Sequence, residues 1–425
     1  MRIILLIFCL MSCSSWAQLM EQNKEKDLQY VQDLASPFKK TKDKIERAIY
    51  SNHFKSIEHR ISRGYHNGIF IQDAASIDFL NQSFQAIFKA NSILKNQSFK
   101  FFLERNNVPN AYSTGSYLYF IHTGLFNYMD NEQQLMAVLC HEIAHDYLRH
   151  TEESIVQYAE FEKDFKREFK SLKRKELLKL IKSQDEILKQ KYDLADQSRK
   201  KEIAADSLGF IFFKNLNYHP EEYYMALKNM ERFDVDEAQK IQDSMYIHLF
   251  DLPGQAFQEK WLRIEKDDFF SGLSFTEHVD EDSIQSHPNL IDRVNWLHTK
   301  FQLQPQEKSG TASPLFLELK QKTEADFYPT FYAKKQYGVA LYYLICQVQS
   351  NENTKDAAAN LGHIFKQLYE SRLNYTFNKY VPQVEQNSTD KAWQTFTAFL
   401  WNLSNEELKY IGEHYQQLSE DNLTL

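Results

Sequence analysis

The chain has 425 residues, of which 43% are hydrophobic and 25% are charged, a composition that excludes a disordered or collagen-like protein. Its 58 acidic residues outnumber its 50 basic ones, and the formal charge of -8 argues against a general nucleic-acid binder, which must neutralise phosphates. Only 11 glycines and 9 prolines are present, too few for a turn-dense all-β architecture. We therefore expect a mainly α (α+β) fold, and at roughly 150 residues per domain the chain is long enough for two or three domains.

Residues 1–17 are predicted to be a signal peptide. The basic Arg2 precedes an apolar run from Ile3 to Met11, and the small Ala17 ends the segment, which is the order typical of export signals. The apolar run is shorter than the roughly 20 residues that span a bilayer, and no other run in the chain approaches that length. Cleavage after Ala17 predicts an exported, periplasmic protein, and lipidation of Cys13 as a membrane-anchored lipoprotein stays open as the alternative.

The next part of the chain is predicted to form helices and then a strand pair. Residues 18–68 are charged and helical in pattern, which indicates a surface element. Residues 74–91 place apolar side chains three to four positions apart behind Asp73, a suitable helix cap. Two aromatic-rich segments, 100–103 and 117–121, are predicted to be short strands separated by turn-forming residues.

The helix that follows is predicted to begin at Asp130, because Gln133 lies three residues later as in a capping box. It contains His141, Glu142 and His145, a His-Glu-x-x-His pattern. The two histidines are one turn apart, so both imidazoles project from the same side and can bind one zinc ion per chain. Glu142 lies about 100° around the helix from His141, close enough to hold a metal-bound water without being a ligand.

A catalytic zinc needs a third protein ligand and an open fourth position. His150 would lie about 140° from His145 on a continuous helix, so we expect it at the surface or behind the ligands. Residues 151–201 are predicted to be a long charged helix, followed by a second helix near 201–213. Glu202 and Asp206 would share one face there, with Glu202 as the third ligand and Asp206 accepting a hydrogen bond from a ligand imidazole.

Over roughly residues 73–300 the sequence resembles the gluzincin metallopeptidases of the HtpX, BepA and CAAX-prenyl-endopeptidase type. Four motifs carry this resemblance: His141–His145 with the trailing Arg149 and His150, Glu202–Asp206, Pro109–Tyr112 leading into 117–121 and 123–125, and Ser286–Pro288 followed by Arg293. The resemblance implies a zincin-like catalytic domain with a small β-sheet edge and a His-Glu-x-x-His helix.

The resemblance also implies a role for each residue. The three expected ligands would bind zinc, and Glu142 would be the catalytic base. His287 would steady the oxyanion or occupy the open zinc position at rest, with Arg293 as its structural partner. Because Pro288 would start a helix, a purely structural His287 is the alternative.

The stretch from Asn110 to Ile121 resembles the edge strand along which the family's substrates lie. An exposed strand edge offers unpaired backbone groups to an extended peptide. The residues expected to contact substrate are Asn110, Ala111, Tyr117 and Tyr119.

Two types within the resembled family, the HtpX and prenyl-endopeptidase types, carry membrane-spanning segments that this sequence lacks. This difference favours the exported BepA-like branch. We therefore expect a zinc-dependent endopeptidase that acts on unfolded or misassembled exported or envelope proteins in protein quality control. A metal-bound chaperone or assembly factor with little proteolysis is the alternative, and the C-terminal helices would then contact envelope proteins.

These features give a plan of the chain. After the signal peptide come an N-terminal helical segment at 18–68 and the peptidase domain at 69–303. A linker rich in Pro, Gly and Ser is expected at 304–323, and an all-helical C-terminal domain at 324–425. The signature of 34-residue helical repeats is absent from this last part.

Overall fold

The computed structural model describes residues 2–169, 184–235, 240–264, 290–304, 310–350, 356–384 and 391–421. The chain divides into two compact units. Unit 1 comprises Met1–Phe233 and Gln285–Glu324, and unit 2 comprises Asp234–Ile284 and Ala325–Leu425. No helix among the described residues is both long enough and apolar enough to cross a membrane.

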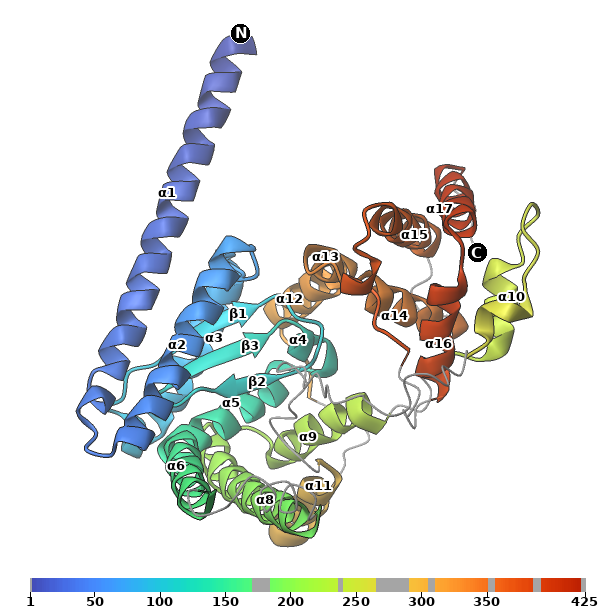
Figure 1. The fold of residues 1–425 in the computed structure, drawn as a ribbon. Coiled ribbons are helices and arrows are strands. Elements are labelled where there is room, and N and C mark those ends of the chain that lie inside the picture. Colours follow the sequence, from blue (N-terminus) through green and yellow to red (C-terminus); the bar gives the residue numbers. More distant parts are fainter. Residues whose placement is uncertain are drawn as a thin grey trace. The chain divides into compact units, whose positions relative to one another are not determined.

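Unit 1 is built around a three-stranded sheet (Figure 1). The strands are β1 (Lys100–Glu104), β2 (Ala111–Ser113) and β3 (Leu118–His122). The helices of this part of the chain are α1 (Arg2–Ala35), α2 (Lys44–His66), α3 (Ala74–Ala90), α4 (Gly124–Tyr128), α5 (Glu132–Tyr147), α6 (His150–Phe169), α8 (Gln184–Lys214), α9 (Pro220–Val235), α11 (Leu290–Phe301) and α12 (Pro314–Ala325), with short 3₁₀ turns η1 (Phe38–Lys40) and η2 (Ser92–Leu94).

The sheet order is β1-β3-β2, so β3 is the central strand. It pairs with β1 in parallel and with β2 antiparallel, and Phe120 lies opposite both Phe102 and Tyr112. The strands expected at 100–103 and 117–121 correspond to β1 and β3. The additional strand β2 lies between them in the sequence and forms an edge of the sheet beside α5.

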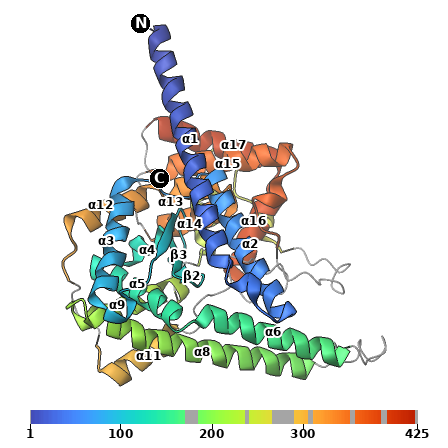
Figure 2. The same ribbon diagram turned by 90° about the vertical axis from the view of Figure 1, so that its left-hand side faces the viewer.

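Helices cover both faces of the sheet, and the alternation of side chains along β3 assigns each residue to one core. Tyr119 and Ile121 pack with apolar residues of α3, α5 and α8. Leu118 and Phe120 pack on the opposite face with residues of α1 and α2. Helices α6 and α8 lie side by side (Figure 2), and Lys201 Nζ on α8 donates to Ser154 Oγ on α6 at 2.7 Å.

Three segments differ from the sequence-based expectation. The N-terminal helical segment is not purely superficial, because Val31, Tyr50 and Ile61 are buried against the sheet. The segment expected as a linker contains α12, whose Phe316 is fully buried and stacks on Phe126 with ring centroids 6.0 Å apart. Helix α8 continues through Lys201 without a break, so the boundary expected there between two helices lies inside one helix.

Unit 2 contains the helices α10 (Asp243–Phe250), α13 (Phe327–Ala333), α14 (Tyr337–Gln349), α15 (Ala357–Leu373), α16 (Lys391–Asn402) and α17 (Asn405–Glu420), with 3₁₀ turns η4 (Glu259–Leu262) and η6 (Phe377–Lys379). They surround a separate aromatic core in which Phe250 and Phe399 lie 4.7 Å apart. Described residues 240–264 belong to this unit, although the sequence analysis placed them with the peptidase domain. The mainly helical fold with a small sheet is confirmed.

Candidate metal centre

Helices α5 and α8 bring the three expected ligands together. The Nε2 atoms of His141 and His145 lie 3.0 Å apart, and each lies 3.4 Å from an oxygen of Glu202. The donor atoms all lie within 4.8 Å of one another, and His141 and Glu202 are only 3% exposed. Two imidazole nitrogens and one carboxylate are the donor types of a catalytic zinc site that keeps a fourth position open. The residues therefore fit zinc.

The sequence around α5 and α8 explains why these donors converge. Asn131 caps α5 by accepting hydrogen bonds from the backbone N–H groups of Gln133 and Gln134 at 2.9 and 3.1 Å. The cap is thus one residue later than the expected Asp130, and the helix begins at Glu132. On α8, Gly209 allows a close approach of the two helices, since a β-carbon there would lie 2.9 Å from His141 Cα.

Asp206 and Arg293 stand behind the ligands; the sequence analysis expected Asp206 there, and expected Arg293 as the partner of His287, which lies outside the described residues. The Asp206 carboxylate lies 2.8 Å from His141 Nδ1, and it accepts two hydrogen bonds from Arg293 at 2.7 and 2.8 Å. Arg293 Nη1 also lies 3.1 Å from Glu202 Oε2. Hydrogen bonding at Nδ1 assigns the proton of a neutral His141 to that atom, which leaves the Nε2 lone pair for a metal.

These neighbours also decide the charge of Asp206. Complete burial alone would raise the pKa of its carboxyl group, but the positive charge of Arg293, together with His141, outweighs the burial and lowers the pKa to about 2. Asp206 therefore stays ionised at neutral pH and can hold His141 in one orientation.

On its other side, α5 accepts backbone hydrogen bonds from the edge strand β2 and from the turn that follows it. The outward-facing N–H of Ser113 on β2 donates to Glu142 Oε2 at 3.0 Å, and the N–H of Tyr117 donates to Asp146 Oδ1 at 3.1 Å. Between these contacts the chain turns through Gly115 and Ser116 with φ of 88° and 57°. Burial raises the pKa of Asp146 to about 7. The Glu142 side chain thus lies beside the free edge of the sheet.

His150 lies behind the ligands, which is one of the two positions expected for it. Helix α5 ends at Tyr147, Arg149 has a φ of 60°, and a new helix begins at His150. This break turns the buried His150 back, so that its Nδ1 lies 2.9 Å from His145 Nδ1. Of the two expected positions, the structure shows the one behind the ligands rather than the surface. The helix break itself was not expected, because no glycine stands at Leu148–His150.

The remaining expected site residues fall in three places. Asn110 and Ala111 lie at the start of the β2 edge, where the Asn110 carbonyl accepts a hydrogen bond from His122 N. Tyr117 lies in the turn before β3, with a φ of 59°. Tyr119 corrects the expectation: it lies on the central strand, 1% exposed, with β1 on one side and β2 on the other, so it is not part of a free edge. His287 lies outside the described residues.

Comparison with known proteins gives two findings. A family model described as "Peptidase family M48" matches residues 79–300, just over half of the chain. Proteins named "Beta-barrel assembly-enhancing protease" from Escherichia coli (strain K12) and Shigella flexneri are 36% identical over 81 residues. That stretch is 19% of this chain and 16% of each relative, so the chain matches only about a sixth of their length.

Proposed function

This chain belongs to peptidase family M48 and is a metallopeptidase, and on that premise we propose that it is a zinc-dependent endopeptidase. The observation that carries the proposal is the convergence of His141, His145 and Glu202 from two helices, with Glu142 between these ligands and a free strand edge. The three ligands would hold one zinc ion, in agreement with the donor types of catalytic zinc sites.

The residues of this chain would divide the chemistry among them. A zinc ion held there would act as a Lewis acid that polarises a carbonyl oxygen, and it would lower the pKa of a water molecule to about 7. Glu142 would accept a proton from the attacking water and deliver it to the leaving amide nitrogen. Asp206 and Arg293 would keep His141 oriented while the peptide carbonyl carbon is attacked. His287 remains a proposed oxyanion partner or resting-state ligand.

The substrate would lie as an extended strand beside β2. The register of β2 with β3 directs the backbone groups of Ala111 and Ser113 away from β3, toward the edge of the sheet, where the Ser113 N–H already donates to Glu142 Oε2. A peptide that adds to this edge gains main-chain hydrogen bonds that do not depend on its sequence, which suits unfolded or misassembled proteins. Asn110 and Ala111 would contact it.

The decisive experiment compares wild type with Glu142→Gln on an unfolded protein such as reduced casein. We expect wild type to bind one zinc ion and to cleave, and a chelator to abolish cleavage. Glu142→Gln should retain its zinc and lose cleavage by about a hundredfold or more, because the proton acceptor is gone. Glu153→Gln, an exposed residue on α6, is the matched control and should behave as wild type. Equal cleavage by wild type and Glu142→Gln that a chelator does not reduce would refute the proposal.

We further propose a role in quality control of exported or envelope proteins. The predicted signal peptide at 1–17 and the name of the relatives, which refers to β-barrel assembly, support this setting. The alternative is a metal-bound assembly factor whose unit 2 helices contact envelope proteins. Complementation of a deletion strain distinguishes the two, since an assembly factor would still work as Glu142→Gln. Cys13→Ala would separate lipoprotein processing from soluble export.

A further inference from the structure

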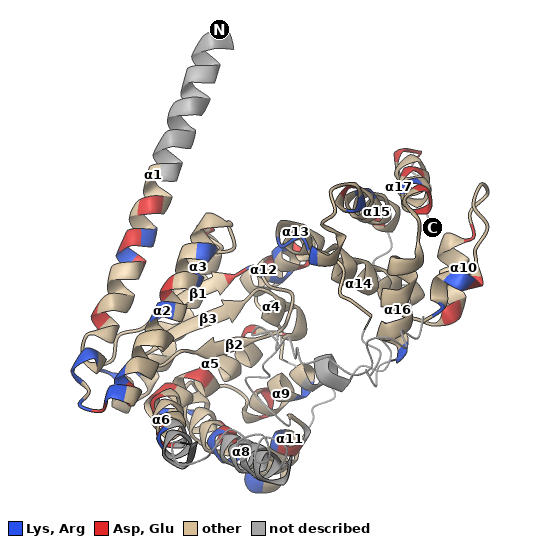
Figure 3. Ribbon diagram, viewed as in Figure 1, with Lys and Arg blue, Asp and Glu red and all other residues tan. Residues whose placement is uncertain are grey.

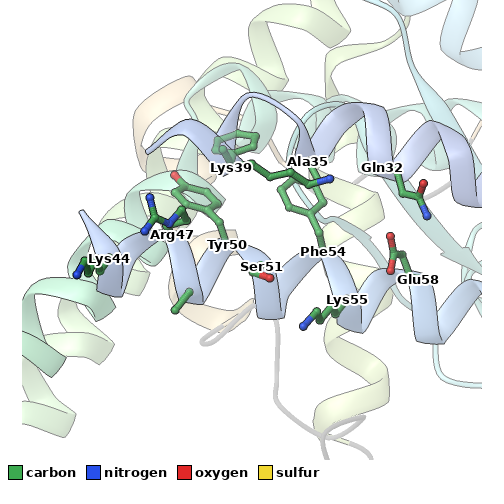
Figure 4. A pocket seen from close by; sticks show the side chains of 12 residues that line it. Gln32, Ala35, Lys39, Lys44, Arg47, Tyr50, Ser51, Phe54, Lys55 and Glu58 are labelled. Atoms are coloured by element: carbon green, nitrogen blue, oxygen red, sulfur yellow. The ribbon is translucent and has the colours of Figure 1, made fainter. Parts of the chain in front are cut away.

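A second cavity of unit 1 lies away from all the residues of the metal centre. It has a volume of about 720 Å³ and lies between the C-terminal end of α1, the turn η1 and one face of α2 (Figure 4). Volumes of roughly 300–1,000 Å³ are typical of pockets that bind small molecules. The residues that line it are absent from the family motifs and from the expected site.

The floor of this cavity is aromatic and apolar. Ala35, Tyr50 and Phe54 line it and are themselves buried. Phe38 stacks on Tyr50 with ring centroids 4.3 Å apart and lies 5.4 Å from the ring of Phe54. These rings belong to the core between the N-terminal helices and the sheet, so the floor is held rigidly by the fold.

The rim of the cavity is basic. Four cations and one carboxylate line it, so its net charge is 4 - 1 = +3, on a chain whose formal charge is -8. They are Lys39, Lys44, Arg47, Lys55 and Glu58. Figure 3 shows the blue segments gathered where α1 turns into α2.

Most of these cations have no acidic partner. Within the described residues, Lys39, Lys44 and Lys55 form no ion pair with a carboxylate. Arg47 donates from Nη1 to the carbonyl of Thr41 at 3.2 Å, which holds the guanidinium at the rim and leaves its other N–H groups available. An unneutralised basic rim over an apolar floor is suited to a ligand that is anionic at one end and apolar at the other.

The shape of the cavity indicates an elongated ligand. Lining residues of α2 recur at intervals of one helical turn, so the cavity follows α2; they include Arg47, Ser51, Lys55 and Glu58. From Arg47 to Glu58 this path is about 16 Å long at 1.5 Å per residue. Three of the four cations lie toward the start of α2, namely Lys44, Arg47 and, in the preceding turn, Lys39, whereas Lys55 lies near the single carboxylate at the other end.

We propose that this cavity binds one single-chain anionic amphiphile, such as a fatty acid, as a monomer from solution. Its carboxylate contacts Lys39, Lys44 and Arg47, and its alkyl chain lies over Ala35, Tyr50 and Phe54. Burial of the alkyl chain on the aromatic floor supplies the affinity, and the cations select an anionic headgroup over a neutral or cationic one.

The test uses the full-length exported chain and dodecanoate below its micelle concentration, measured by titration calorimetry. We expect one dodecanoate per chain and no binding of the cationic dodecyltrimethylammonium. The double variant Lys39→Glu/Arg47→Glu should weaken dodecanoate binding by about tenfold or more, because it turns attraction into repulsion. Ser51→Trp, a change at an exposed lining residue that spares the buried floor, should block the cavity and abolish binding.

Lys42→Glu is the matched control, because Lys42 is exposed in the same basic turn but does not line the cavity. It should bind dodecanoate as wild type does, and circular dichroism should show that all variants keep the wild-type helix content. An equal loss of binding in Lys42→Glu would overturn the proposal in favour of a nonspecific basic patch. Absence of dodecanoate binding, or binding only to phosphatidylglycerol vesicles, would overturn it as well. None of these outcomes depends on peptidase activity.

Discussion

Two places in unit 1 combine an arginine, a buried carboxylate and a histidine, and they differ in what else converges there. At the metal centre, Asp206 accepts two hydrogen bonds from Arg293 and lies beside His141. At the end of β1, Glu104 accepts two hydrogen bonds from Arg60 at 2.6 and 2.8 Å and lies 3.5 Å from His122.

The two carboxylates have the same electrostatic state for the same reason. Burial would raise the pKa of each, but the neighbouring arginine and histidine outweigh it and lower the pKa to about 2 in both cases. Around Glu104 the other neighbours of His122 are the carbonyl oxygen of Val108, 3.1 Å from Nδ1, and the amide of Asn106, 3.4 Å from Nε2. Within the described part of the chain, this cluster is not among the groups that could hold a metal ion.

The metal centre contains two further donors that face His141, namely His145 and Glu202. An Arg–carboxylate–His cluster can therefore be purely structural, as it is around Glu104. The additional donors on the next turn of α5 and on α8 make the other cluster a candidate metal site.

The difference in donors between the two clusters predicts that substitutions in only one of them abolish zinc binding, which is the strongest effect we expect. His145→Ala or Glu202→Ala should abolish zinc binding and reduce cleavage of unfolded protein by about a thousandfold or more, because the site loses a third of its ligands. His122→Ala should leave the zinc content at one ion per chain. Metal analysis of the purified variants decides the matter, and a loss of zinc in His122→Ala would remove the distinction between the two clusters.

Replacing Arg293 should lower the free energy of unfolding more than replacing Arg60. Arg293 is fully enclosed, so Arg293→Met leaves the charges of Asp206 and Glu202 buried and should lower the free energy of unfolding of the zinc-free protein by about 3–5 kcal/mol. Arg60 keeps 30% of its side chain exposed, so Arg60→Met should cost about 1–3 kcal/mol. Urea denaturation of both variants measures the two costs, and zinc should restore part of the stability only in Arg293→Met.

The pH dependence of the free energy of unfolding should report the charge state of Glu104. Its pKa of about 2 in the folded protein is below its ordinary value of 4.5, so its ionised form stabilises the fold above pH 4.5. This contribution, about 3 kcal/mol, is lost as the pH falls through 2. Denaturation of wild type and Glu104→Gln between pH 7 and pH 2 should give stabilities that converge at low pH. Parallel curves would contradict the assigned charge state.

The smallest effect concerns the cap of α5. Asn131→Ala removes the acceptor for two backbone N–H groups and should lower the free energy of unfolding by about 1 kcal/mol. Zinc affinity should change little, because His141 lies more than two turns away along the helix. Asn131→Asp keeps the cap and is the control. A large loss of zinc in Asn131→Ala would show that the cap positions the ligands.

The sequence predicted the parts of the site that depend on local spacing. His141 and His145 are one turn apart, and so are Glu202 and Asp206, so the helical period alone places each pair on one face. The family resemblance predicted Arg293 only as a structural partner of His287, and the contacts of Arg293 with Asp206 and Glu202 were not predicted.

Features that depend on distant contacts were not predictable in this way. The cluster of Arg60, Glu104 and His122 joins residues from α2, β1 and β3 that share no spacing. Strand β2 has only three residues, too few for a periodic pattern. Phe316 could not be recognised as a core residue, because its burial depends on packing against helices far away in the sequence.

Gly209 has a consequence for how the active centre could evolve. Its hydrogen atom faces the α5 backbone at His141, where any larger side chain would meet both His141 Cα and the hydroxyl of Tyr223, 2.6 Å away. Gly209 therefore sets the distance between α5 and α8 where they cross, and with it the spacing of the ligand atoms, although Gly209 is not itself a ligand. Gly209→Ala should increase the distance between the ligand atoms on α5 and on α8 and weaken zinc affinity by about tenfold, although every ligand is retained. A competitive chelator titration would measure this loss.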